Sequence, residues 1–131
     1  MAYAAAETRS STHHDGVQHI LIVLAETDAA TASEATLSGL PVVGRVMRVT
    51  SSLTSGTGTV LDSIVGVSTA PAGADVVVEN GDPAAIVDMQ TASGYRYYSP
   101  TGTLYLRNRV NDATADHVIA SRLLIVAGWG D

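Results

Sequence analysis

The chain is organised as a series of short runs rich in Val, Thr and Tyr, separated by Gly, Pro, Asn and Asp. Between residues 17 and 129, no run is followed by a convincing amphipathic helix. Short apolar runs bounded by turn-forming residues are typical of β-strands that return through tight turns. The sequence therefore predicts an all-β fold: a single antiparallel β-sandwich or jelly-roll-like barrel of about eight strands.

The composition suits such a fold. Of the 131 residues, 46% are hydrophobic, which is enough for one domain with a sizeable core. Phe is absent and Trp occurs once, so Val, Leu, Ile and Ala must fill that core, and β-branched side chains pack well on pleated sheets. We expect residues 17–131 to form the β-domain. Residues 1–16 are small and polar, and we expect them to form a flexible N-terminal arm that a partner orders.

Two runs give the clearest strands. Residues 17–25 (VQHILIVLA) are almost entirely apolar, which is typical of a strand covered on both faces. Residues 117–127 (HVIASRLLIVA) predict a long strand in the centre of a sheet. Between them, residues 26–41 show no apolar periodicity, and they predict a long exposed loop or one weak helical turn. Such a loop is a candidate contact surface.

Turn signals predict which strands pair. Residues 42–52 and 57–68 are expected to form a hairpin, with Gly56 and Gly58 supplying positive φ angles. Residues 95–99 and 103–110 are expected to form a second hairpin around a tight reversal at 100–102. Further strands are expected at 74–79 and 84–89.

The charge excludes several classes of function. The formal net charge is −6 and the pI is about 4.9, and all seven basic residues are Arg. Binding to DNA or RNA needs clustered cations, whereas Arg107 and Arg109 are the only basic residues two positions apart in this sequence. The absence of Cys excludes disulfides and thiol catalysis. The N-terminus lacks a secretory signal, and the longest apolar stretch, 20–25, is too short to cross a bilayer, so we expect a soluble protein with no membrane partner.

No motif predicts a reaction or a cofactor. His13, His14, Asp15 and His19 are the one cluster of metal-ligand residue types, but adjacent histidines on a flexible arm do not preorganise a site. The loop 56–59 (GTGT) lacks the Lys and the helix of a phosphate-binding loop, and no Ser lies in a nucleophile elbow. The aspartates do not have EF-hand spacing, which leaves calcium binding in the loops open. We therefore expect no catalytic, cofactor or metal site, and no enzyme.

The most distinctive surface signal lies near the second expected hairpin. Alternation along residues 103–110 places Leu104, Leu106 and Val110 on one face and a Tyr and two Arg on the other. Tyr and Arg are enriched in protein interfaces. The predicted interface comprises Tyr95, Tyr97, Tyr105, Arg107 and Arg109. Two alternatives stay open: a platform on which sugars stack, with Tyr98 and Trp129 added, and ordinary cross-strand packing on a solvent face.

Residues 45–129 resemble small structural proteins of tailed bacteriophages that decorate or cement the capsid. The resemblance rests on 55–88 (SGTGTVLDSIVGVSTAPAGADVVVENGDPAAIVD), 99–107 (SPTGTLYLR) and 121–129 (SRLLIVAGW). The shared features are general ones, namely a chain rich in Ala, Thr, Val and Gly, free of Cys, and all-β. Receptor-binding and tail-associated β-domains have the same features.

The resemblance implies a homotrimer on the outer surface of a virion, where it bridges major capsid subunits without catalysis after existing as a soluble protein in the host cytoplasm. It carries no specific functional residue onto this chain. The alternative function is a carbohydrate-binding or receptor-binding β-sandwich module.

Overall fold

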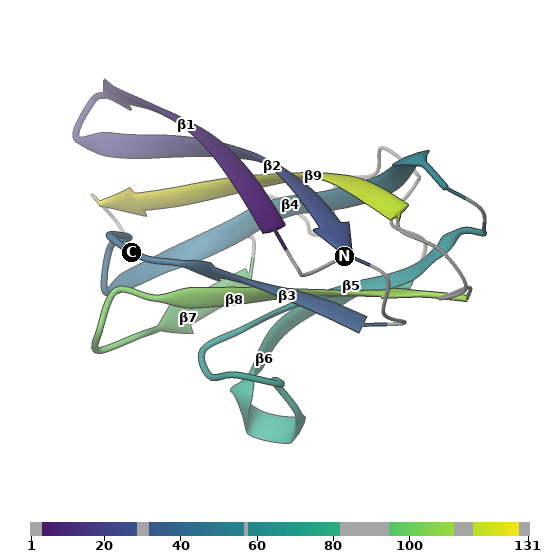
Figure 1. Ribbon diagram of the computed structural model, residues 1–131. Coiled ribbons are helices and arrows are strands. Elements are labelled where there is room, and N and C mark those ends of the chain that lie inside the picture. Colours follow the sequence, from purple (N-terminus) through teal and green to yellow (C-terminus); the bar gives the residue numbers. More distant parts are fainter. Residues whose placement is uncertain (1–3, 29–31, 57, 82–94, 112–116, 129–131) are drawn as a thin grey trace.

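The computed structural model describes residues 4–28, 32–56, 58–81, 95–111 and 117–128 (Figure 1). The strands are β1 (Ala4–His14), β2 (Val17–Asp28), β3 (Ala32–Leu37), β4 (Val43–Ser55), β5 (Val60–Gly66), β6 (Val76–Asn80), β7 (Tyr95–Tyr98), β8 (Leu104–Val110) and β9 (His117–Gly128). A short 3-10 helix, η1 (Gly73–Asp75), precedes β6. The predicted strand at 84–89 lies outside the described residues.

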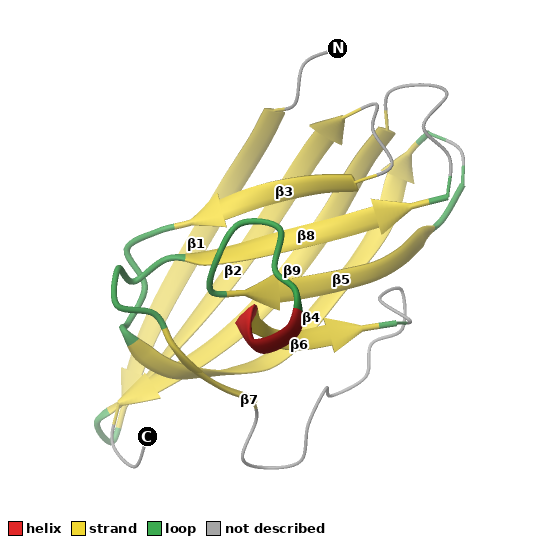
Figure 2. Cartoon of the chain, turned by 90° about the horizontal axis from the view of Figure 1, so that it is seen from below, coloured by secondary structure: helices red, strands yellow, loops and turns green. Residues whose placement is uncertain are grey.

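The strands form two sheets that pack as two layers (Figures 1 and 2). The five-stranded sheet has the order β1-β2-β9-β4-β7, and the four-stranded sheet has the order β3-β8-β5-β6. Every pairing is antiparallel. The predicted all-β sandwich is therefore confirmed, with nine strands in the described part of the chain where about eight were expected.

The core lies between the two sheets and is built by alternation along their long strands. On β2, Ile20, Ile22 and Leu24 point inward and are almost fully buried. On β9, Leu123 and Ile125 do the same. The prediction that residues 117–127 form a central strand is confirmed, because β9 lies in the middle of the five-stranded sheet, between β2 and β4.

The expectation of a loop or helical turn over residues 26–41 is wrong. Glu26 belongs to β2, and residues 32–37 form β3, an edge strand that pairs with β8. Ser33, Ala35 and Leu37 point inward and are buried. Two of these inward residues are small, so the segment lacks the alternation of bulky apolar and polar side chains that indicates a strand.

Both expected hairpins are also wrong in their pairing. β7 pairs with β4 in the five-stranded sheet, whereas β8 pairs with β3 and β5 in the other sheet. Likewise β4 and β5 lie in different sheets. The reversals themselves exist: Gly102 N–H donates to Ser99 O over 3.0 Å, and Gly56, Gly58 and Gly102 all have positive φ. These turns carry the chain from one layer to the other instead of returning it beside the preceding strand.

The segment expected as a flexible arm is placed in a strand. Residues 4–14 form β1, which pairs with β2 along its whole length. A two-residue turn at Asp15 and Gly16, with φ angles of 52° and 78°, joins the two strands. Residues 5–14 are nevertheless exposed except for the half-buried Arg9, so β1 is attached to the sandwich mainly through its backbone.

Candidate interaction surface

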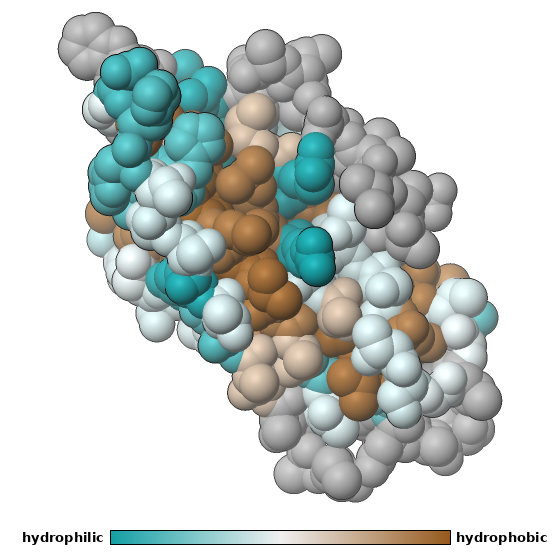
Figure 3. Space-filling model, turned by 90° about the horizontal axis from the view of Figure 1, so that it is seen from above, coloured by the Kyte–Doolittle hydropathy of each residue, from teal (hydrophilic) through white to brown (hydrophobic). Residues whose placement is uncertain are grey.

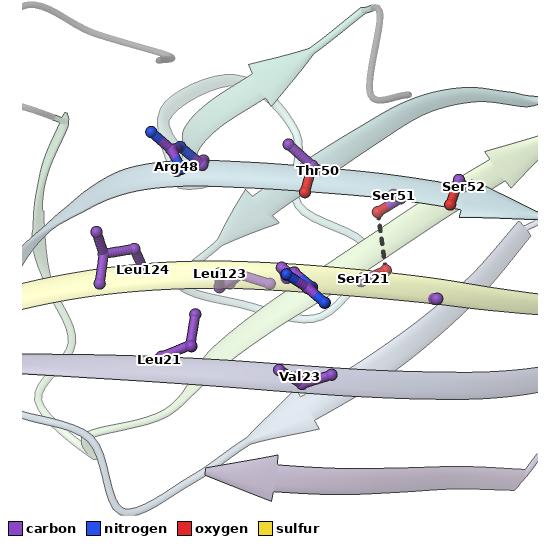
Figure 4. Close-up of a pocket in the computed structure, with 11 residues that line it drawn as sticks. Leu21, Val23, Arg48, Thr50, Ser51, Ser52, Ser121, Leu123 and Leu124 are labelled. Carbon is purple, nitrogen blue, oxygen red and sulfur yellow. Dashed lines mark hydrogen bonds between the residues drawn. The ribbon is translucent and has the colours of Figure 1, made fainter. Parts of the chain in front are cut away.

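The outer face of the five-stranded sheet carries a regular grid of side chains from β1, β2, β9 and β4. Strand register aligns three rows: Ser10–Leu21–Leu124–Arg48, Thr8–Val23–Arg122–Thr50 and Ala6–Ala25–Ala120–Ser52. Figure 4 shows the part of this grid on β2, β9 and β4, except Ala25. We call the nine positions on these three strands the outer-face grid. Its apolar members concentrate on β2 and β9, and its polar members on β4.

The grid leaves large apolar side chains in contact with solvent. Leu21 is 39% exposed and Val23 is 36% exposed. Figure 3 looks onto this face and shows a brown apolar band with hydrophilic side chains on both sides. A hollow of about 600 Å³ lies over β2, β9 and β4. The third row contains only Ala and Ser, so the surface is lower there than beside the bulkier first row.

Two arginines bring positive charge to this apolar surface. Arg122 occupies the centre of the grid and is exposed, and the half-buried Arg48 ends the first row. Arg gives up its hydration shell more readily than Lys and forms planar, bidentate contacts with carboxylates. An apolar surface of this kind can bind a partner that combines apolar side chains with acidic groups.

The predicted Tyr/Arg face of residues 103–110 has the expected alternation. Leu104, Leu106 and Val110 are buried on β8, whereas Tyr105, Arg107 and Arg109 lie on its outer side. This side is the outer face of the four-stranded sheet, so it points away from the outer-face grid.

Arg109 forms a salt bridge with Asp62 of the same chain. Its Nε donates to both carboxylate oxygens of Asp62, over 2.9 and 3.0 Å, and its Nη2 also contacts this carboxylate. The hydrogen bonds from Arg109 hold the pKa of Asp62 below its ordinary value, against the opposing effect of burial. The same pair raises the pKa of Arg109. Asp62 is buried and needs this cation, so Arg109 has a structural role before any contact with a partner.

A loop of the chain covers part of the same face. The segment 67–75 folds back over β5, and Pro71 is buried so close above Gly66 that a Cβ at Gly66 would clash with it (Figure 2). The Ala70 N–H donates to Glu34 Oε2 over 2.7 Å, which ties the loop to β3. Gly66 pairs with Tyr105 across the sheet, so the loop lies near the tyrosine end of the predicted interface.

The predicted tyrosines of β7 lie elsewhere. Tyr97 is buried, and its hydroxyl donates to Pro41 O over 2.8 Å. Tyr95 is partly buried and packs against the main core cluster. The five predicted interface residues are therefore divided between two sheets and do not form one surface. On β7 the exposed aromatic side chain is Tyr98, at 63%.

The residues considered for metal binding do not converge. Among the described residues, no three His, Asp or Glu side chains form a group that could hold a metal ion. His14 Nε2 lies 3.3 Å from Asp15 Oδ2 at the exposed β1–β2 turn, and register places His13 opposite Gln18 and His19 opposite Thr12. Asp82, Asp88, Asp112, Asp116 and Trp129 lie outside the described residues. Within the described ranges, no helix is long and apolar enough to cross a membrane.

The outer-face grid was not predicted from the sequence, although the apolar run of residues 17–25 contains its three positions on β2. The run VQHILIVLA was interpreted as a strand covered on both faces. In the structure the four-stranded sheet covers only the face of Ile20, Ile22 and Leu24. The second face of β2 therefore carries large apolar side chains, Leu21 and Val23, that the sandwich leaves in contact with solvent.

Comparison of the chain with protein-family models, with curated proteins and with solved structures finds no match.

Proposed function

We propose that the protein is a non-enzymatic structural protein that binds a large protein assembly through the outer-face grid. In this proposal the assembly is the capsid of a tailed bacteriophage, and the partner is its major capsid subunit. The observation that carries the proposal is the exposure of Leu21 and Val23 on a strand whose sequence is typical of burial on both faces.

Burial of this face supports binding energetically. Each square ångström of apolar surface removed from water contributes roughly 25 cal/mol. The grid places Leu21, Val23 and Leu124 side by side on neighbouring strands, so a partner can cover them together. Contiguous exposed apolar surface on a folded protein is typical of an interaction site.

The capsid as partner is favoured by the resemblance to decoration proteins and by avidity. A shell presents the same subunit many times, so a protein with several copies of one weak site gains affinity from simultaneous contacts. Closed symmetry lets each copy make an equivalent contact. Arg48 and Arg122 on the binding face favour a partner surface with acidic groups.

The carbohydrate-binding alternative has less support from the described residues. A stacking platform needs aromatic rings exposed side by side, whereas Tyr97 is buried and Tyr95 packs against the core. Tyr105 lies on the opposite sheet from Tyr98. The positions of these tyrosines therefore do not favour a sugar-binding platform.

The test is binding of labelled protein to expanded capsid shells that lack their decoration protein, prepared from the phage that encodes the chain. The double variant Leu21→Ser/Val23→Ser should lose most of its binding and stay folded. Leu61→Ser is the matched control, because Leu61 is 46% exposed on the other sheet. Equal binding by the double variant and the control would show that the outer-face grid is not the site. Wild-type protein that does not bind the shells would overturn the capsid role itself.

A further inference from the structure

The free edge of β1 is the longest unpaired edge of an edge strand in the described part of the chain. β1 spans 11 residues and pairs with β2 on one side only. The other edge strands, β3, β6 and β7, have six, five and four residues. Natural proteins usually protect long edges with charged side chains, Pro or bulges, because unpaired N–H and C=O groups are a template for another strand. β1 contains neither Lys nor Pro and pairs with β2 without a register shift.

The β1–β2 turn determines which backbone groups face the free edge. In a two-residue hairpin the residues that flank the turn form a hydrogen-bonded pair, and bonded and non-bonded pairs then alternate along the strands. The flanking pair here is His14 and Val17. The even-numbered residues of β1 therefore bond to β2, and residues 5, 7, 9, 11 and 13 direct their N–H and C=O groups outward.

The charged residues of β1 favour one register for a strand that pairs with this edge. We propose that two copies of the chain pair through antiparallel β1 strands, with Thr8 opposite the partner's Thr8. In this register Glu7 lies directly opposite the partner's Arg9, and both residues belong to the set whose backbone faces outward. A two-fold centred on Glu7 or on Arg9 would instead place like charges opposite each other, which is destabilising. Among the symmetric registers, the one centred on Thr8 is the one that opposes Glu7 and Arg9.

The two charged side chains are already held in place. Arg9 Nη2 lies 2.8 Å from Glu7 Oε2, and Arg9 Nη1 donates to Ser38 O over 2.8 Å. In the paired edge, each Glu7 carboxylate would lie between its own Arg9 and the partner's Arg9, so the four charges alternate. Because Arg9 is fixed by Ser38 before pairing, less side-chain freedom is lost on association.

The pairing joins two five-stranded sheets into one continuous sheet. The two-fold axis runs perpendicular to that sheet, so both outer-face grids lie on the same side of it. The inference concerns a different surface from the proposed capsid contact and does not depend on it. It gives a two-fold dimer, whereas the resemblance to decoration proteins implies a trimer.

A disulfide test locates the axis. The chain has no Cys, so Thr8→Cys introduces a single thiol at the proposed axis. Directly opposite residues of a non-bonded pair have Cα atoms about 4.5 Å apart, within the range of a disulfide. Ser10→Cys is the matched control on the same face, because Ser10 lies opposite the partner's Ala6. Mild oxidation should give a covalent dimer with Thr8→Cys and not with Ser10→Cys, and the reverse result would overturn the register.

A charge exchange tests the contact in solution by sedimentation equilibrium. Glu7→Arg and Arg9→Glu each place like charges opposite each other and should raise the dimer Kd by about tenfold or more. An equimolar mixture of the two variants restores opposite charges at every position and should form a heterodimer. A monomeric wild type, or a mixture that stays monomeric, overturns the pairing. Wild-type protein that is monomeric and still binds capsid shells would overturn this inference alone.

Discussion

Asn108 and Glu26 meet at the centre of the sandwich: Asn108 Nδ2 donates to Glu26 Oε1 over 2.8 Å, although 82 residues separate them in the chain. Both side chains are completely buried. Asn108 Nδ2 also donates to Ser121 Oγ, and Asn108 Oδ1 accepts from Ser51 and Ser63. One asparagine therefore connects β8 to β2, β9, β4 and β5 through side-chain hydrogen bonds.

These residues belong to a polar layer that crosses the core. In the four-stranded sheet, register aligns Ser33, Asn108, Ser63 and Asn80 in one row that runs over all four strands, and all are buried. Ser51 and Ser121 face this row as a pair on the opposite sheet, with Ser51 Oγ and Ser121 Oγ 2.8 Å apart (Figure 4). The main apolar cluster lies on one side of the layer, and the small cluster of Val60, Val110 and Ile119 is separate from it. A slip of either sheet would leave buried polar groups unpaired, so the layer favours one alignment of the two sheets.

Replacement of Asn108 should be strongly destabilising. Asn108→Ala removes the shared partner of four buried side chains. The three serines keep their hydrogen bonds to one another, whereas Glu26 loses the Asn108 amide. Each buried polar group left without a hydrogen bond costs about 1 to 3 kcal/mol. We expect the free energy of unfolding to fall by about 3 kcal/mol in urea denaturation. The control is Asn111→Ala, which removes one hydrogen bond from Thr59 N–H at an exposed site and should cost no more than about 1 kcal/mol. Equal effects of the two variants would contradict a central role for the polar layer.

The Asp62–Arg109 pair should make stability depend on pH in the acid range. Folding lowers the pKa of Asp62 below its ordinary value of 3.8, so the folded state binds this proton less readily than the unfolded state. The contribution to stability is therefore present above about pH 4 and is lost as the pH falls through the folded-state pKa. The urea midpoint of Asp62→Asn should differ most from wild type near neutral pH, and the difference should shrink in acid. A difference that stays constant with pH would show that the carboxylate charge is not responsible.

Arg107 and Arg109 should differ in their effect on stability, although the sequence presents them as equivalent. Arg109→Ala leaves the buried carboxylate of Asp62 without its cation, whereas Arg107 lies opposite Glu34 and Ile64 in the sheet. We expect Arg109→Ala to lower the thermal midpoint clearly more than Arg107→Ala. Differential scanning calorimetry of the two variants measures this, and a larger loss for Arg107→Ala would contradict the assignment.

The sequence predicted those features that depend on a single strand. The continuous apolar run on β2 and the length of β9 led to the correct core strands, and the alternation of β8 placed Arg107 and Arg109 outward as found. The same alternation places Asn108 on the face of Leu106, which is the signal by which its burial could have been predicted.

The sequence did not predict features that depend on which strands become neighbours. A Gly with positive φ indicates that the chain reverses, but the same turn serves a hairpin and a crossing between layers. At Ser99–Thr103 the crossing is fixed by long-range contacts: Leu40 N–H donates to Gly102 O over 2.9 Å, from a segment 62 residues earlier in the chain by their numbers. The Tyr/Arg interface was predicted from a hairpin that does not form, so its members were assigned to one surface in error.

A side chain at the Gly102 crossing would meet two obstacles, namely the strain of a positive φ and a steric clash of its Cβ. Other glycines in the chain allow the two effects to be measured separately. Gly102 has a φ of +68°, and a Cβ there would lie 2.5 Å from Leu40 O, a backbone atom that cannot move aside cheaply. Gly73 has a φ of +59° but open space around it, and Gly81 has open space without a positive φ.

Substitution by Ala at these three positions should therefore give a graded series in urea denaturation. Gly102→Ala combines backbone strain with a clash and should cost at least about 3 kcal/mol. Gly73→Ala has the strain alone and should cost about 1 kcal/mol, and Gly81→Ala should change stability by no more than about 0.5 kcal/mol. If Gly102→Ala costs no more than Gly73→Ala, the close approach of Leu40 is not a constraint, and the reversal between the sheets is held by backbone conformation alone.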